Sequence, residues 1–456
     1  MATKEAQYVT AFREFERDGA AADPSWVRDI RRSAIADFER LGFPVERKGN
    51  EPWKYTDVRP LASAEFATSG PGNRLTAQDI GRFDLPCPRV HQLVFVNGHY
   101  APALSTEPPS EAELHSDVLV KRSDGPIVGR LADALAYGLP LVHQHLARHV
   151  LHDRNSFAAL NTAFVHDGAF VYIPNGMTVL EPIHLLFITT DTGPPAVTHP
   201  RVLVIAGRDS KATVVHSFEG LAANGGYFTN SVTEVVAGAD AVLNMCRIQR
   251  EGDASFHMAT THASLGRDST LASTALDLGG GLVRHDISAE LTGAGAHVSL
   301  NGLYLGTGER HIDNHTFIDH AVPDTISDEV YKGILDDQAH GVFVGHILVR
   351  PDAQRSDARL FNKSLLLSKG AEMDTQPKLE IFADDVKCTH GAAVGQIDKD
   401  ALFYLNSRGL GSDEAHRLLV HGFVNEVVES IDDDAVRQYA DQAVMAALGE
   451  TESGVT

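Results

Sequence analysis

The sequence predicts a mainly β protein whose core is a right-handed parallel β-helix, a solenoid, with α-helical regions at its N- and C-terminal ends. Apolar residues follow a period of two from about residue 163 to residue 396, and helical spacings on either side. Turns rich in glycine, aspartate and alanine recur at near-regular intervals, and no helical segment interrupts the strands. Short strands that repeat without helices are typical of a solenoid.

The spacing of the turns sets the size of one coil. Early turns begin at Gly207, Ala237, Gly266 and Gly293, which are 30, 29 and 27 residues apart, and later turns begin at Asp336, Pro351, Ser368 and Phe382, which are 15, 17 and 14 apart. Since the second spacing is about half the first, each coil should contribute two strands that run parallel to their equivalents in the next coil. A β-sandwich or jelly roll also has short strands, but the 15 or more strand-like segments exceed one sandwich.

The core, residues 163–396, opens with strands that alternate apolar and other side chains. They are expected at residues 169–174, 183–188, 201–205, 212–216, 231–236 and 241–245. Before the core, residues 1–125 form a helical and mixed region in which one helix begins with Asp23 as N-cap and Pro24 at its first position. Residues 126–162 form a helical lead-in, because leucines and valines recur there three or four residues apart.

Residues 397–456 return to helix. The first helix begins near Asp398, which places acidic residues at its positive end, the second begins at Ser412, and the third runs from Asp432 to about Leu448. A solenoid needs its terminal coils covered. These helices are therefore expected to close the exposed end of the stack, although they could equally dock a partner.

Composition limits the class of protein. The 456 residues carry 39 basic and 61 acidic side chains, a formal charge of 39 − 61 = −22, which argues against phosphate-backbone binding and a polybasic membrane contact. The three cysteines, Cys87, Cys246 and Cys388, form no CxxC pair, so a disulfide framework and a zinc ribbon are excluded. Without a signal-like apolar segment or a membrane span, a cytoplasmic location is expected.

The segment Asp384–Gly391 (DDVKCTHG) carries the first candidate site. Alternate residues of a strand project from one face, so Cys388 and His390 should point into one shared space. A thiol and an imidazole together favour iron, copper or zinc. The simpler interpretation is that Cys388 is a small buried apolar residue.

A second candidate is the segment His311–His315 (HIDNH). On a strand, His311, Asp313 and His315 would share one face and could bind a metal ion, but solvated turn and ladder residues explain the pattern more simply. The chain has no phosphate-binding GxxxxGK[ST] loop and no GxSxG elbow. Two classes stay open: a β-helix carbohydrate-active enzyme with carboxylates converging near residues 230–320, and a His-rich metal-binding β-barrel protein.

Several segments, in this order, closely resemble the SufB/SufD family of iron–sulfur cluster assembly scaffolds. They are Pro52–Asp57 (PWKYTD), Asp167–Phe170, Ile173–Gly176, Tyr331–Leu335 (YKGIL), Gly341–Gly345, Ser364–Ser368, Pro377–Ile381, Asp384–Ala392 and Leu402–Gly409. Residues 331–387 lack the further cysteine that SufB-like chains carry late in the solenoid, and Lys387–Ala392 differs from their EHEA-type segment. The resemblance therefore favours the SufD branch, with a SufB-like cluster-holding scaffold as the alternative.

The resemblance implies a non-catalytic scaffold. Such a chain pairs with a SufB-like subunit through the ends of the two β-helices and binds the SufC ATPase through its C-terminal helices, while a cysteine desulfurase system supplies sulfur indirectly. It also implies that His390 contributes to a transient iron–sulfur cluster or iron at the interface, with Cys388 as a weaker candidate ligand. Alone, the chain could form a homodimer. An incomplete ligand set shared by two subunits suits a scaffold that must release its cluster.

Overall fold

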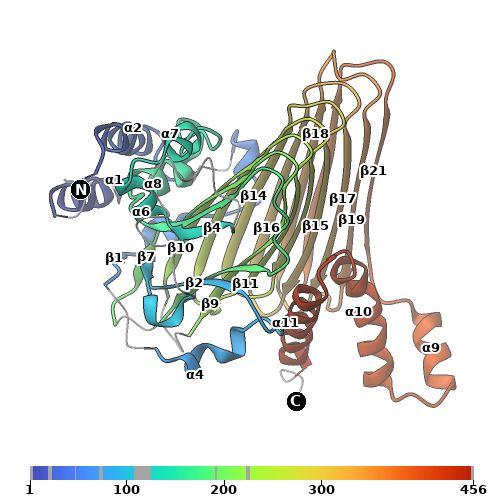
Figure 1. The fold of residues 1–456 in the computed structure, drawn as a ribbon. Coiled ribbons are helices and arrows are strands. Elements are labelled where there is room, and N and C mark those ends of the chain that lie inside the picture. Colours follow the sequence, from blue (N-terminus) through green and yellow to red (C-terminus); the bar gives the residue numbers. More distant parts are fainter. Residues whose placement is uncertain are drawn as a thin grey trace.

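The computed structural model describes residues 4–18, 23–46, 48–70, 75–106, 125–190, 193–221 and 226–452. Two long sheets face each other and form a flattened parallel solenoid that runs through the middle of the chain (Figure 1). Helices from the N-terminal part lie beside the first coils, and the C-terminal helices lie along one flank. The predicted fold class, a mainly β solenoid with helical regions at both ends, is confirmed.

The first sheet, sheet A, contains β4 (Ile127–Arg130), β5 (Gly168–Ile173), β8 (Arg201–Ala206), β10 (Phe228–Ala237), β12 (Phe256–Leu265), β14 (Leu282–Leu291), β16 (His311–His320), β18 (His340–Val349) and β20 (Glu372–Ile381), with β1 (Ala67–Thr68) and β7 (Ala196–Thr198) at its side. The second sheet, sheet B, contains β3 (His99–Tyr100), β2 (His91–Val96), β6 (Ile183–Thr189), β9 (Lys211–Gly220), β11 (Val242–Arg250), β13 (Thr270–Asp277), β15 (His297–Gly306), β17 (Ile326–Leu335), β19 (Asp357–Leu366) and β21 (Lys387–Gly395). From β8 onward successive strands alternate between the sheets, so each coil contributes two strands, as the turn spacing predicts.

The register of the strands fixes the length of a coil. Phe228 of β10 lies beside Phe256 of β12, 28 residues later, and His340 of β18 lies beside Glu372 of β20, 32 residues later. Every pair from β8 and β9 onward is parallel. The first coil also takes β2 from the region before residue 125, where it pairs in parallel with β6.

The turns explain why aspartate and glycine recur between the strands. Asp209, Asp240 and Asp268 adopt positive φ values of 56°, 61° and 53°, a conformation that aspartate tolerates better than most residues. Their backbone N–H groups donate to carbonyls in the next coil, as from Asp209 to Ala239 at 2.9 Å. The turns therefore stack in the same ladder as the strands.

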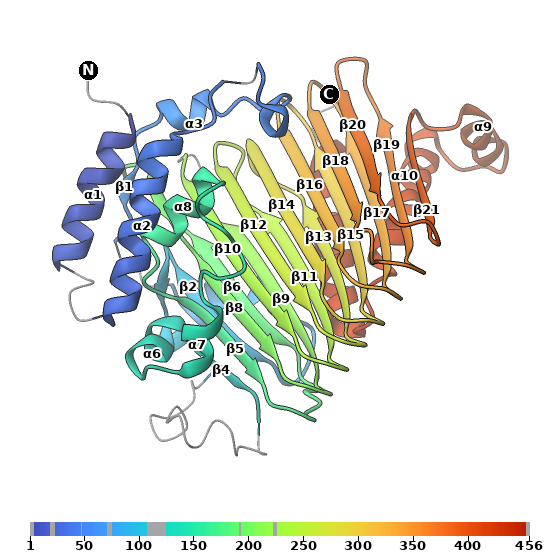
Figure 2. The same ribbon diagram turned by 90° about the horizontal axis from the view of Figure 1, so that it is seen from above.

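The inward faces of the two sheets form one apolar core along the solenoid. The outer face of sheet A near its first strands is covered by α1 (Lys4–Asp18), α2 (Ser25–Leu41), α3 (Arg59–Ser63), α6 (Leu131–Ala136), α7 (Pro140–His145) and α8 (Ser156–Ala163), as Figure 2 shows, while α4 (Ala77–Ile80) lies beside β2. Helix α2 begins one residue later than predicted: Pro24 is its N-cap, because the Asp23 carboxylate instead binds the buried Arg31 guanidinium at 2.6 Å.

The C-terminal helices are α9 (Lys399–Ser407), α10 (Ser412–Val428) and α11 (Asp434–Glu452). The prediction that they close the end of the solenoid is wrong. Apolar residues of α10 and α11, among them Val424 and Val444, pack on the outer face of sheet B against residues such as Ile248 and Leu303. These outer positions are apolar, so sheet B needs a cover along its flank, and the helices supply it.

Candidate functional site

The last coil of the solenoid is left open. Sheet B ends at β21 and sheet A at β20, and no further strand of the described ranges pairs with either (Figure 2). The N–H of Lys387 donates to the Ser356 carbonyl on the β19 side at 2.9 Å. Because backbone groups alternate in direction along a strand, the N–H groups of Cys388 and His390 point toward the free edge. This edge can pair with a strand of another chain.

Cys388 and His390 occupy inward positions of β21, as the period-two prediction requires. Cys388 lies beside Ala358 and His390 beside Leu360, and both neighbours on β19 are fully buried in the solenoid core. Because β21 has no coil above it, the same positions are accessible there: His390 is exposed and Cys388 is half-buried. The structure therefore places the two predicted residues on one face, at the open end of the interior.

The Cys388 thiol is held in its protonated form. Burial raises its pKa above the ordinary value, and the negative charge of Asp357 on the neighbouring strand adds to the rise. The thiolate is the form that binds iron, so metal binding here must displace a proton. Asp357 is a neighbour that the sequence could not identify, because only the register of β19 and β21 brings it close.

No three histidine, cysteine or acidic side chains of the described segments converge as an assembled metal site does. The final coil therefore offers at most two soft or borderline ligands, Cys388 and His390. Iron in sulfur clusters is usually held by four protein ligands per cluster. A cluster or iron ion at this position would need further ligands from another chain.

Gly391 has a packing role that its neighbours in the sequence do not reveal. A β-carbon at this position would lie 3.1 Å from Cδ1 of Phe361, so the Phe361 ring covers the glycine on the outer face of sheet B. In the sequence, this close approach is indicated only by the fact that a glycine, which has no side chain, follows His390. The contact fixes the backbone beside His390.

The rim of the open coil exposes several large apolar side chains among charged ones such as Asp384 and Lys387. Phe382 is 61% exposed and Val394 is 45% exposed, and Ile381 and Phe361 are also exposed. Pro377 lies within β20, a residue that sheets tolerate at an edge. Exposed apolar side chains gathered at one end are typical of a protein–protein interface.

A second exposed surface lies on α9, which projects from the body of the molecule beside α10 (Figure 1). Phe403 is 74% exposed and Tyr404 is 55% exposed on this helix, and Leu418 of α10 is exposed as well. The base of α10 is fixed to sheet B through Lys332 of β17, whose ammonium group donates to the Phe423 carbonyl at 2.7 Å. Helices α9 and α10 are thus attached to sheet B at one end and expose apolar side chains at the other.

His311, Asp313 and His315 do share the outer face of β16, but they form a structural network and are not all solvated. Asp313 is 1% exposed and binds Arg284 at 2.7 Å, while His315 lies 2.9 Å from its other oxygen. The Thr56 hydroxyl donates to Asp313 and contacts His311 at 2.9 Å. Burial lowers the pKa of His311 to about 4. The network ties the 52–56 segment to sheet A.

The carboxylates between residues 230 and 320 do not converge as an enzyme's acid and base would. Glu234 binds Arg201, Asp277 binds Arg247 and Asp313 binds Arg284, at 2.5, 2.5 and 2.7 Å. Glu234 and Asp313 lie on the outer face of sheet A but on β10 and β16, which β12 and β14 separate, whereas Asp277 lies on the inner face of sheet B; all three carboxylates are buried. The solenoid topology likewise excludes the β-barrel alternative.

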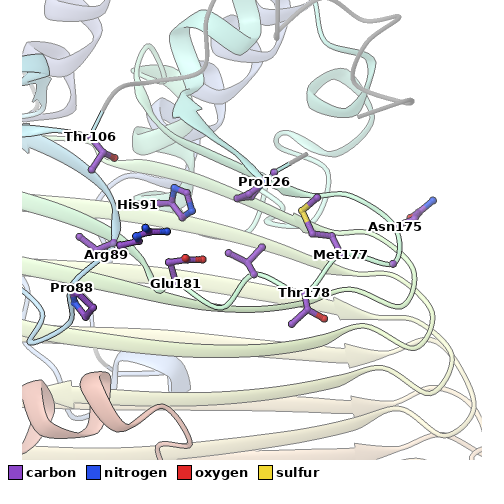
Figure 3. Close-up of a pocket in the computed structure, with 13 residues that line it drawn as sticks. Pro88, Arg89, His91, Thr106, Pro126, Asn175, Met177, Thr178 and Glu181 are labelled. Carbon is purple, nitrogen blue, oxygen red and sulfur yellow. The ribbon is translucent and has the colours of Figure 1, made fainter. Parts of the chain in front are cut away.

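A pocket of about 1040 Å³ lies at the opposite end of the solenoid, beside β2 and the turn after β5 (Figure 3). Its walls include Arg89, His91, Asn175, Met177 and Glu181. Neither Cys388 nor His390 belongs to it. Its rim also includes Thr106 and Gly125, on either side of a segment outside the described residues.

Fold and site together define a β-solenoid protein whose final coil is unpaired and carries a thiol and an imidazole. The profile of the SUF system FeS cluster assembly, SufBD core domain matches residues 187–423, and that of the SufBD protein N-terminal region matches residues 2–185. The chain therefore belongs to the SufBD family of iron–sulfur cluster assembly proteins.

Individual relatives agree and favour the SufD branch. The chain is 30% identical to the iron–sulfur cluster assembly protein SufD of Escherichia coli over 96% of this chain and 94% of that protein. It is 25% identical to SufD of Bacillus subtilis over 95% of each, and 32% identical to a SufBD family protein of Synechocystis over 88% and 87%. The chain is thus a SufD-like member of the family. No described helix has both the length and the apolar character needed to span a bilayer.

Proposed function

We propose that this chain is a non-catalytic scaffold subunit that pairs with a SufB-like subunit through its final coil and presents His390 to iron or a nascent cluster at the interface. The observation that carries the proposal is the open end of the solenoid, where inward positions of β21 meet solvent. Cys388 is a second, weaker candidate ligand, and its raised pKa means that the thiol must lose a proton to bind iron.

Pairing through the final coil is supported by backbone and side chains alike. The edge of β21 has unpaired N–H and carbonyl groups, and strand addition to such an edge gives affinity through main-chain hydrogen bonds. The apolar side chains of the rim, among them Phe382 and Val394, would be buried by the same contact. Without a SufB-like subunit, a second copy of this chain is the alternative occupant, which would give a homodimer.

The exposed surface of α9 and α10 is the proposed docking site for the SufC ATPase. Phe403 and Tyr404 supply aromatic side chains of the kind that anchor protein interfaces. The chain has no phosphate-binding loop of its own, so ATP hydrolysis is assigned to that partner. Nucleotide-driven movement of α10 would act on sheet B, because Lys332 joins the two.

Iron or the growing cluster is the cargo of this scaffold, and the proposed site binds it only transiently. Imidazole is a workable substitute for thiolate on cluster iron. One or two ligands from this chain leave the remaining positions to the SufB-like subunit, so separation of the interface would release the cluster. Sulfur would reach the complex from a cysteine desulfurase system in the cytoplasm, without direct contact being required of this chain.

The test replaces His390 by alanine and co-expresses the variant with SufB-like and SufC-like subunits. We expect the three-subunit complex to assemble as before, while cluster formation, followed by absorbance and iron content, is lost. Cys388→Ala should have a milder effect. The matched control is His143→Ala, which removes an exposed imidazole on α7, far from the interface. Full cluster formation in the His390→Ala complex would refute the role of the imidazole.

A SufB-like role, in which this chain holds the cluster by itself, is the alternative. It is disfavoured because residues 331–387 contain no cysteine and because the final coil presents only two candidate ligands. Reconstitution of the isolated chain with iron and sulfide separates the two. A stable cluster bound to the chain alone would favour the SufB-like role, and a cluster that requires the partner supports the SufD-like one.

A further inference from the structure

Several buried polar side chains inside the solenoid have no part in the proposed scaffold role. Glu329 of β17 lies in the inward row that also contains Leu300, Leu360 and, at the open end, His390. Leu300 and Leu360 belong to the apolar core, so the Glu329 carboxyl points into it. Glu329 is fully buried, and neither of its oxygens has a hydrogen-bond partner.

Two further oxygen-bearing side chains face the same interior from sheet A. Asn314 and Thr316 occupy inward positions of β16, in rows with the core residues Phe343 and Ile287. They are 1% and 3% exposed, and the Asn314 amide and the Thr316 hydroxyl are unpartnered as well. Thr316 lies near enough to the Glu329 carboxyl to lower its pKa, although no hydrogen bond of good geometry joins the two side chains. Strands β16 and β17 are consecutive, so all three side chains belong to one coil.

Unpartnered polar groups of this kind are costly. An amide or hydroxyl buried without a hydrogen bond costs roughly 1–3 kcal/mol, and an isolated carboxylate costs far more. A buried carboxyl persists only with a proton or with a positive charge beside it. Burial raises the pKa of Glu329 to about 8, opposed only by Thr316, so no cationic side chain of the described segments neutralises it.

We propose that Glu329, Asn314 and Thr316 form an internal binding site for a monovalent cation, sodium or potassium, held by oxygen atoms between β16 and β17. Carboxylate, amide carbonyl and hydroxyl oxygens are the ligands that such hard cations take. The charge of the site favours a monovalent over a divalent cation. One carboxylate balances a single positive charge, whereas a divalent ion would leave a net charge in the core.

The other unpartnered groups of the interior do not point to an ion. Asn362 and Thr375, in the later coils, are neutral side chains with one unpartnered oxygen each. His216, Arg247, His257 and His285 lie nearer the first coils and combine donors with acceptors, next to the carboxylates of Glu251 and Asp277. Ordered water can satisfy such a mixture. Within the described part of the solenoid interior, only the Glu329 coil combines a carboxyl whose two oxygens both lack a hydrogen-bond partner with neutral oxygen ligands.

The test measures the thermal unfolding of the full chain in potassium, sodium and tetramethylammonium chloride at equal ionic strength. Tetramethylammonium is too large to enter the site. We expect the melting temperature to be about 1–3 °C higher with potassium or sodium. The difference should grow as pH rises, because the cation competes with the proton on Glu329.

Variants identify the site. Glu329→Gln should abolish the difference between the salts. Thr316→Val should reduce the difference, and this variant provides the test if Glu329→Gln does not fold. Glu219→Gln is the matched control: it removes a buried carboxylate already paired with Arg250 at 2.7 Å, and should keep the cation dependence. Equal melting temperatures in all three salts, or the same salt dependence in Glu329→Gln, would overturn the proposal. Anomalous diffraction from thallium-soaked crystals should show a peak beside Glu329, and a water molecule there instead would also overturn it.

Discussion

Replacing Glu234 by glutamine tests how the N-terminal helices are held on the solenoid. Glu234 of β10 and Arg201 of β8 form an ion pair at 2.5 Å in which both side chains are fully buried. The Glu234 carboxylate also accepts the backbone N–H groups of residues 147–150 at 2.9–3.3 Å. Arg201 binds Asn161 and Thr162 at the end of α8. One pair thus anchors both an interior segment and the C-terminal end of the lead-in to sheet A.

The cost follows from the charge left behind. Glutamine keeps the shape of the side chain but leaves the Arg201 guanidinium buried without a counter-charge, a loss of roughly 3–5 kcal/mol. The single carbonyl oxygen of glutamine cannot accept four N–H groups, so the expected loss of stability lies toward the upper end of that range. Burial alone would raise the pKa of Glu234, but Arg201 and the backbone N–H groups lower it below the ordinary value. The native charge is therefore strongly favoured.

Urea unfolding of wild type and Glu234→Gln gives the difference in free energy, and hydrogen exchange reports on residues 147–150. We expect those four amides to lose protection before the strands of the core do. The control is Asp240→Asn, which breaks an exposed pair with Arg267 and should cost less than about 1 kcal/mol. A loss below about 1 kcal/mol in Glu234→Gln, with unchanged exchange, would refute the anchoring role.

Two further predictions concern the backbone and acid stability. Gly168→Ala should prevent stable folding, because φ is 146° and the new Cβ would lie 1.9 Å from the Arg201 carbonyl, whereas Gly308→Ala, at φ 61° in open space, should lower stability by only about 1 kcal/mol in thermal melts. His184 and His216 are buried and His199 is half-buried, and the loss of solvation lowers the pKa of all three to about 3. Since the unfolded chain binds protons near pH 6.5, stability should fall as pH drops from about 6.5 toward 3. Urea midpoints that stay constant from about pH 7 to 5 would contradict this.

The sequence predicts the solenoid well because its signals are local. A strand with one buried face shows a period of two, and the left-handed turn positions of Asp209, Asp240 and Asp268 demand the residues that mark turns in the sequence. The alternation also places Cys388 and His390 on one face. None of these inferences needs to know which strand lies beside which.

The position of the C-terminal helices could not be predicted in the same way. The apolar face of α10 and α11 fits an open end or a flank equally well. The choice is made by the outer positions of sheet B, such as Ile248, Leu276 and Ile334, which are apolar and need cover. In the sequence they are indistinguishable from inward positions, because strands buried on both faces lose their alternation. The pairing of Asp313 with Arg284 and Thr56 is likewise a product of register and tertiary contact.

The open end suggests how a solenoid acquires a candidate site without a special loop. Along the row of His390, the same inward position holds Met245, Leu300 and Leu360, all packed in the core. At β21 the stack stops, so a position that is buried at Met245, Leu300, Glu329 and Leu360 and half-buried at Ser273 becomes accessible there. A ligand at this position is fixed by the strand ladder yet faces whatever covers the end. Rigid support with an exchangeable cover is what a site completed by a partner requires.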